Sequence, residues 1–183
     1  MSADPTALIL MYFVLPVWLA AGFADWLCHL ASDIQRTSGV KESLIHSLMC
    51  IQAAIPLLAA MFLEINATII GVMIAAYIMH EATAMWDITY ATTARRVSPI
   101  EQLVHSFLEV IPLMAIGSVI SLHWSQFLAV FGYGAEPPSF VLAWKSQPLP
   151  FWYIAVILTI IVAFEFIPYA EELFRCLRAN SRQ

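Results

Sequence analysis

The stretch that decides the fold is ATIIGVMIAAYIMHEATAMWDITYATTARRVSPIEQLVHSFLEVIPL, which runs from residue 67 to residue 113. It consists of two apolar runs separated by the pair Arg95-Arg96. About 20 helical residues, at ~1.5 Å each, cross a bilayer core of ~30 Å, and both runs are long enough to do so. The stretch therefore predicts two transmembrane helices joined by a short basic turn.

The rest of the chain has the same character. Of its 183 residues, 61% are apolar and 11% are charged, and the mean hydropathy is +0.80. Soluble domains are about 45–50% apolar and ~25% charged, so a soluble fold is excluded. We expect one all-α membrane domain over residues 1–183, surrounded by the lipid bilayer. Its apolar runs predict five transmembrane helices, at about residues 7–29, 43–63, 67–92, 100–122 and 151–170.

Basic residues are distributed unevenly between the ends of these helices. One side of the membrane receives Arg36, Lys41, Arg95, Arg96, Arg175, Arg178 and Arg182, whereas the other receives only Lys145. Because cytoplasmic loops are enriched in Lys and Arg, we expect an outside N-terminus and a cytoplasmic C-terminus, as in a bacterial inner-membrane protein. The net charge of −5 and the lack of a basic stripe argue against nucleic acid as a partner.

Four of the five predicted helices carry a carboxylate and an imidazole. A charged side chain within the bilayer costs roughly 2.5–3.5 kcal/mol on insertion scales, so each one needs a physical explanation. The pairs are Asp25 and His29, Glu42 and His46, His80 and Asp87, and Glu101 and His105. Residues four or seven apart lie on one face of a helix. Given the predicted orientation, we expect all eight side chains in one polar layer near the cytoplasmic side.

An internal repeat underlies this pattern. Arg36, Glu42 and His46 have the same spacing as Arg95, Glu101 and His105. The repeat extends over about residues 20–60 and 80–116, so the first four helices are expected to form two equivalent helical hairpins around the polar layer. Hairpins with the same orientation would be related by a pseudo-two-fold axis along the membrane normal.

Four carboxylates and four imidazoles match the needs of two divalent metal ions. Oxygen and nitrogen donors suit such ions, and four carboxylates neutralise two of them. We expect no basic residue inside the layer. At the level of pattern, the chain resembles the four-helix di-iron carboxylate proteins in a membrane-embedded form. That resemblance implies iron as the metal, with zinc as the alternative.

The leading functional hypothesis is therefore a di-iron oxidoreductase that acts on a hydrophobic small molecule near the cytoplasmic face. Glu42 and Glu101 are equivalent in the repeat and are the best candidates for bridging carboxylates. Glu109 and Tyr90 are candidate catalytic residues, for proton handling and for hydrogen bonding or electron transfer. An external electron donor is expected, because the sequence has no nucleotide-binding, haem or cysteine-cluster motif.

Other functions fit the same residues. The pairs would serve as interhelical salt bridges in a purely structural bundle. A zinc-dependent membrane hydrolase would use metal-bound water as its nucleophile. A metal-binding or transport protein, or a structural subunit of a membrane complex, is a third class, and an oligomer is compatible with each of them. The outer parts of the helices are nearly all apolar, which favours a closed site over a transport path.

Overall fold

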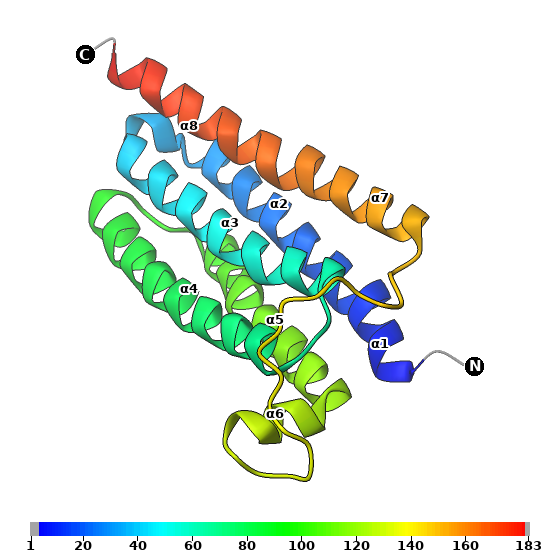
Figure 1. Cartoon of the computed structure of the whole chain (residues 1–183). Coiled ribbons are helices and arrows are strands. Elements are labelled where there is room, and N and C mark those ends of the chain that lie inside the picture. Colours follow the sequence, from blue (N-terminus) through cyan, green and yellow to red (C-terminus); the bar gives the residue numbers. More distant parts are fainter. Residues whose placement is uncertain (1–3, 182–183) are drawn as a thin grey trace.

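The computed structural model describes residues 4–181, and these residues are mostly helical with no named β-strand among them. The order of elements is α1 (Pro5–Ile9), η1 (Leu10–Val14), α2 (Leu15–Ala31), η2 (Ile34–Arg36), α3 (Gly39–Phe62), α4 (Ala67–Ala94), α5 (Pro99–Leu122), α6 (Trp124–Val130), α7 (Phe151–Ile160), η3 (Ile161–Phe166) and α8 (Ile167–Asn180). Figure 1 shows these elements as a bundle of long helices. The all-α prediction is confirmed.

Five helices are long and apolar enough to cross a membrane, as predicted. They are Pro5–Ala31, Gly39–Phe62, Ala67–Ala94, Pro99–Leu122 and Phe151–Asn180. The fifth ends at Asn180, beyond the expected residue 170, because the helix continues through the polar segment EELFRCLRAN. This extension matters for the site, since it carries a buried glutamate, Glu172, into the bundle.

Two of the five long helices contain a wider π-helical turn. The turns η1 and η3 each end two residues before a proline, Pro16 and Pro168. Proline lacks a backbone N–H and its ring clashes with the carbonyl four residues earlier, so the usual hydrogen-bond ladder is interrupted there. The helices continue through both turns, and η3 carries Glu165.

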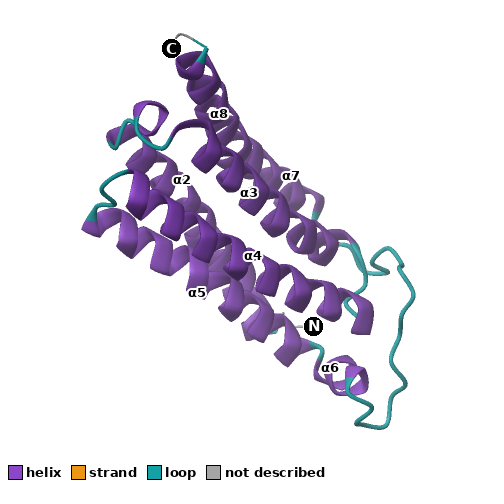
Figure 2. Ribbon diagram, turned by 90° about the vertical axis from the view of Figure 1, so that its left-hand side faces the viewer, coloured by secondary structure: helices purple, strands orange, loops and turns teal. Residues whose placement is uncertain are grey.

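The main contacts among α2, α3, α4 and α5 run between the two predicted hairpins and not within them. The helix α3 packs mainly against α4 and α8, and α2 packs mainly against α5. Figure 2 shows α8 alongside α3, with α4 and α5 on the other side of the bundle. The two expected hairpins are therefore not confirmed. The repeated arginines also differ, because Arg36 is exposed beside Asp33 whereas the side chain of Arg95 is buried.

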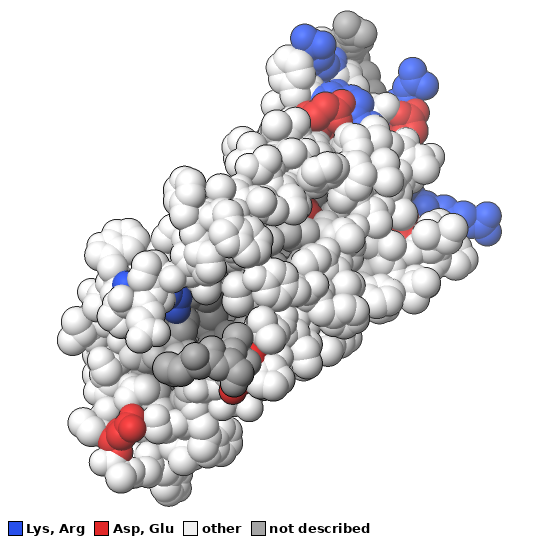
Figure 3. All heavy atoms as spheres, turned by 90° about the vertical axis from the view of Figure 1, so that its right-hand side faces the viewer, with Lys and Arg blue, Asp and Glu red and all other residues white. Residues whose placement is uncertain are grey.

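Charged side chains are concentrated toward the ends of the bundle. Figure 3 shows Lys, Arg, Asp and Glu side chains gathered toward the end of α8, with a long and largely uncharged surface beside them. We call this end, formed by the turns at residues 32–38 and 95–98 and by the end of α8, the Arg-rich end. The opposite end is crossed by the loop between α6 and α7 (Figure 2).

Candidate metal centre

Ten side chains meet inside the bundle near the Arg-rich end. They come from α2, α3, α4, α5 and α8 and from the residue directly after α4, and most of them are buried. We call this group the polar cluster. Its members are Asp25, His29, Glu42, His46, Asp87, Arg95, Glu101, His105, Tyr169 and Glu172.

Two imidazoles form the centre of the polar cluster. The rings of His29 and His46 are stacked, with centroids 4.2 Å apart and planes 7° from parallel. One carboxylate from α8, that of Glu172, lies 2.9 Å from the Nδ1 atom of each ring. A carboxylate accepts hydrogen bonds, so both Nδ1 atoms carry the proton and donate it to Glu172. Both Nε2 atoms therefore point away from Glu172.

The two Nε2 atoms face other carboxylates. That of His29 lies 3.3 Å from Asp25 and 3.8 Å from Glu101. That of His46 lies 3.3 Å from Asp87 and 3.9 Å from Glu42. Both nitrogens are buried without a hydrogen-bond partner among residues 4–181. An imidazole lone pair next to carboxylate oxygens needs a cation between them, either a proton or a metal ion.

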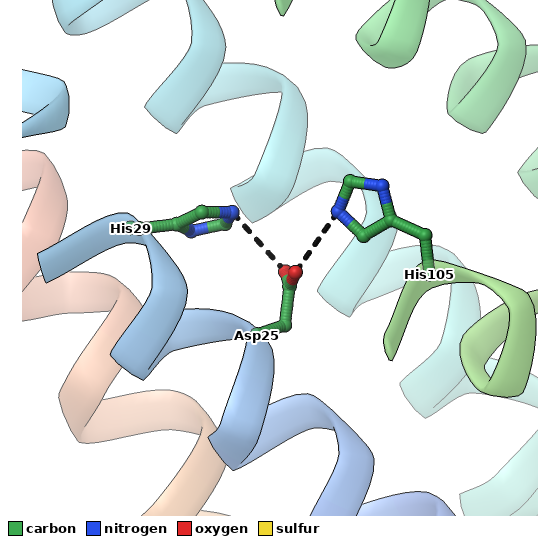
Figure 4. A group of neighbouring side chains, drawn as sticks. All are labelled: Asp25, His29 and His105. Atoms are coloured by element: carbon green, nitrogen blue, oxygen red, sulfur yellow. Dashed lines mark ion pairs between the residues drawn. The ribbon is translucent and has the colours of Figure 1, made fainter. Parts of the chain in front are cut away.

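Asp25 connects a third imidazole to this group. Figure 4 shows its carboxylate between His29 and His105, and the distance to the Nε2 atom of His105 is 2.9 Å. The hydroxyl of Tyr169 donates toward Asp25 over 3.1 Å and lies at the same distance from the carbonyl oxygen of Gly22. Asp25 is thus held by groups from α5 and α8 as well as by its own helix.

Arg95 occupies the space between the two glutamates of the internal repeat. Its guanidinium contacts the Glu42 carboxylate at 2.6 Å and the Glu101 carboxylate at 2.5 Å, and its side chain is 2% exposed. The expectation that no basic residue enters the polar layer is therefore wrong. Arg95 follows the last residue of α4, and its long side chain extends from that end into the bundle.

Local sequence explains how Glu101 reaches this position. Ser98 caps α5 and accepts a hydrogen bond from the backbone N–H of Glu101 at 3.1 Å, while the Glu101 carboxylate accepts one from the backbone N–H of Ser98 at 3.3 Å. This capping box, with Pro99 as the first helical residue, holds the glutamate at the start of the helix. The same carboxylate then binds Arg95.

The polar cluster contains side chains that could hold metal ions. One candidate group is Asp25, His29 and His105, and another is His29, Glu42 and His46, each with ligand atoms within 4.8 Å of one another. Five carboxylates and one guanidinium leave four negative charges when the imidazoles are neutral. Two divalent cations would neutralise these charges, as the sequence predicts, because Glu172 and Arg95 cancel each other.

Seven of the eight residues predicted as ligands lie in the polar cluster, and His80 does not. His80 is buried outside it, in the wall of two cavities, the smaller of which is also lined by Asp25 and His46. The two predicted catalytic residues also lie elsewhere. The hydroxyl of Tyr90 donates to the carbonyl of Ser38 at 2.9 Å, and Glu109 is exposed on α5. Helical spacing alone therefore did not identify which of these side chains enter the polar cluster.

Three members of the polar cluster were not predicted as ligands or partners. Tyr169 and Glu172 follow Glu165 by four and seven residues, so the three share a helix face. That spacing is the signal that could have identified Glu172. Arg95 was interpreted as a determinant of topology; its place in the internal repeat distinguishes it from Arg96, but not from the equivalent Arg36, which is exposed.

The fold and the site define a class: a helical bundle of membrane-spanning length with a buried His and carboxylate cluster that could hold metal ions. No protein-family model, curated protein or solved structure matches the chain.

Glu165 lies beside the polar cluster, and the position of its side chain requires a glycine at residue 22. Its carboxylate packs so closely against Gly22 that an added Cβ would overlap it. Together with Asp25, His46 and Tyr169 it lines a cavity of about 120 Å³. Gly22→Ala is expected to lower the free energy of unfolding by about 1 kcal/mol, the low end of the cost of overpacking, because only the flexible end of the Glu165 side chain must move. Detergent-solubilised protein unfolded with SDS and followed by tryptophan fluorescence provides the measurement.

The control is Gly117→Ala on α5, where an added Cβ meets nothing within 4 Å. This change should be neutral or stabilising by about 0.5–1 kcal/mol, since alanine favours helix more than glycine does. Glu165→Ala should restore the stability of Gly22→Ala. An equal loss in both glycine variants would contradict the predicted clash.

Proposed function

We propose that the protein is an integral-membrane oxidoreductase that uses two divalent metal ions, assigned as iron, to oxidise a lipid-soluble substrate. One observation carries the proposal. Glu172 fixes the tautomer of two buried imidazoles, so that two unpartnered Nε2 atoms point at carboxylates. A carboxylate that orients a histidine from behind is the usual arrangement around metal-bound histidine in proteins.

The residues divide into three roles in this proposal. His29, His46 and His105 would be terminal ligands through Nε2, with Asp25 and Asp87 beside them. The carboxylates of Glu42 and Glu101 would neutralise part of the charge of the two ions while they remain bonded to Arg95. Iron in a His and carboxylate site with open positions binds and activates dioxygen. Arg95 covers both glutamates, and the burial of the group keeps water away from it.

The surroundings support a hydrophobic substrate. The 120 Å³ cavity reaches Asp25 and His46, and most of its wall is apolar, including Leu19, Met49 and Leu108. A substrate dissolved in the bilayer would reach such a site without crossing water. The excess of basic residues supports a cytoplasmic location for the Arg-rich end, where a soluble electron donor would dock.

Metal content tests the proposal. Protein purified without added metal is expected to contain about two iron ions per chain by elemental analysis, one for each pair of facing imidazole and carboxylate groups. His46→Ala removes one Nε2 ligand and should leave at most one ion. His123→Ala, at the opposite end of the bundle, is the matched control and should retain both.

Three outcomes would count against the proposal. Zinc in place of iron would contradict the oxidoreductase function and favour the zinc-dependent hydrolase. A wild-type protein that is folded but metal-free would overturn both, and would mean that protons on the imidazoles hold the cluster together. Equal metal content in His46→Ala and wild type would refute the assignment of the ligands.

A further inference from the structure

A second and larger cavity occupies the half of the bundle away from the polar cluster. Its volume is about 260 Å³, and α2, α3, α4 and α5 all contribute to its wall. The wall is mainly aliphatic, with residues such as Leu57, Met73, Ala115 and Ile116. An elongated apolar cavity inside a membrane bundle has the chemistry of a site for a hydrocarbon chain.

The inner end of this cavity adjoins the polar cluster. His80 and Gln52 lie there, and the Nδ1 atom of His80 and the Oε1 atom of Gln52 are buried without a partner among residues 4–181. His80 and Trp18 also line the 120 Å³ cavity that reaches Asp25 and His46. The two cavities therefore share a wall, and a hydrocarbon chain bound in the larger one would end close to the candidate metal ligands.

The outer end is closed by the loop between α6 and α7. This loop pairs with the end of α3 and the residues after it, since the backbone N–H of Glu64 donates to the carbonyl of Ala143 and the backbone N–H of Lys145 donates to that of Phe62, both at 2.9 Å. The Glu64 carboxylate also accepts hydrogen bonds from Ser146 at 2.7 and 2.6 Å. These bonds hold Lys145 at the cavity, where His123 is a second basic group.

This outer end carries the ammonium group of Lys145, and the charge of the nearby Glu64 carboxylate acts on both Lys145 and His123. Lys145 forms no ion pair within residues 4–181. Burial lowers the pKa of Lys145, although Glu64 opposes that change. Burial and the charge of Lys145 together lower the pKa of His123. An anion bound between the two side chains would stabilise the protonated form of both.

We propose that the cavity binds a single-chain lipid with a carboxylate head group, such as a long-chain fatty acid. The head group would bind Lys145 and His123, and the tail would extend to His80. On α3 the wall of the larger cavity runs from Met61 to Gln52, which at ~1.5 Å per residue is about 14 Å, and the smaller cavity continues from there to His46. If the proposed oxidoreductase function holds, one atom of dioxygen would insert into a C–H bond of the lipid far from the carboxylate, and the other would leave as water with two protons and two electrons from the external donor.

Binding of a fluorescent long-chain fatty acid and of its matched alcohol to the purified full chain, in uncharged detergent, tests the proposal. Lys145→Met is expected to raise the Kd for the acid by roughly ten- to a hundredfold, because a charged hydrogen bond is lost. The Kd for the alcohol should stay the same. Lys41→Met, an exposed lysine at the Arg-rich end, should bind both probes like wild type.

A bulky residue in the cavity provides a second and independent test. Ala76→Trp fills the cavity and should abolish binding of both probes, whereas Ala75→Trp, exposed on the same helix, should not. His123→Leu keeps the lysine and should weaken acid binding in case Lys145→Met does not fold. Phosphatidylglycerol in excess should not displace the acid, because its two chains need a wider site.

Several outcomes would overturn the proposal. The absence of saturable binding to wild type contradicts it, and so does displacement of the acid by phosphatidylglycerol. Equal affinity for the acid in Lys145→Met and wild type also contradicts it. So does a loss of acid binding in Gln52→Leu together with unchanged binding in Lys145→Met. The last result would place the head group at the inner end. Metal analysis of the same samples separates the two hypotheses, since a metal-free protein that binds the acid contradicts only the oxidoreductase function.

Discussion

Replacing Arg95 with leucine is expected to lower the free energy of unfolding by about 3–5 kcal/mol. The guanidinium is the only basic group that touches Glu42 and Glu101 within 4 Å among residues 4–181, apart from the imidazoles. Without it, two buried carboxylates face each other without compensation. Unfolding with SDS in mild detergent, monitored by tryptophan fluorescence, measures the change.

The neighbouring arginine supplies the control for this experiment. Arg96 is exposed, so Arg96→Leu should change stability by less than about 0.5 kcal/mol. Adding Glu42→Gln to Arg95→Leu should recover part of the loss, because one of the uncompensated charges disappears. Equal stability of the Arg95 and Arg96 variants would show that Arg95 does not compensate the glutamates in the folded protein.

Replacing Glu172 with glutamine should weaken metal binding by about ten- to a hundredfold while preserving the fold. Glutamine has the shape of glutamate but offers one oxygen acceptor and one NH₂ donor. It can accept a hydrogen bond from only one of the two Nδ1–H groups that now donate to Glu172. The other imidazole must take the opposite tautomer, which places its proton on Nε2 and blocks metal binding there.

Competition with a calibrated chelator measures the affinity of each variant. Glu171→Gln is the matched control, because Glu171 is 46% exposed and pairs only with Arg175 on its own helix. It should bind metal like wild type. An unchanged metal affinity in Glu172→Gln would contradict the proposed role of Glu172. It would not contradict metal binding itself.

Much of the fold follows from local sequence. Hydropathy predicted all five long helices, and four of them end close to the predicted boundaries. The reason is physical, because apolar segments of this length are stable as helices in a bilayer whatever their neighbours are. Helical spacing likewise predicted that Asp25, His29, Glu42 and His46 would lie at one depth, and the polar cluster contains all four.

Spacing along one helix does not decide which of its side chains reach the polar cluster. His80 and Asp87 are seven residues apart, a separation that spans about 10 Å along the axis at ~1.5 Å per residue. Asp87 therefore reaches the polar cluster while His80 reaches the cavities. Glu109 has a similar azimuth to His105 but is exposed, because small rotations at a helix interface separate a buried from an exposed position.

The sequence alone determined that this is a five-helix membrane-type bundle and that its few ionisable residues gather near one end. Only the tertiary structure decided that Glu172 lies behind two imidazoles and that Arg95, but not Arg36, enters the interior. Hydropathy and helical periodicity are properties of one segment. The partner of a buried charge depends on which helices pack together, and in this chain α8, the end of the fifth long helix, packs against α3, which is the second.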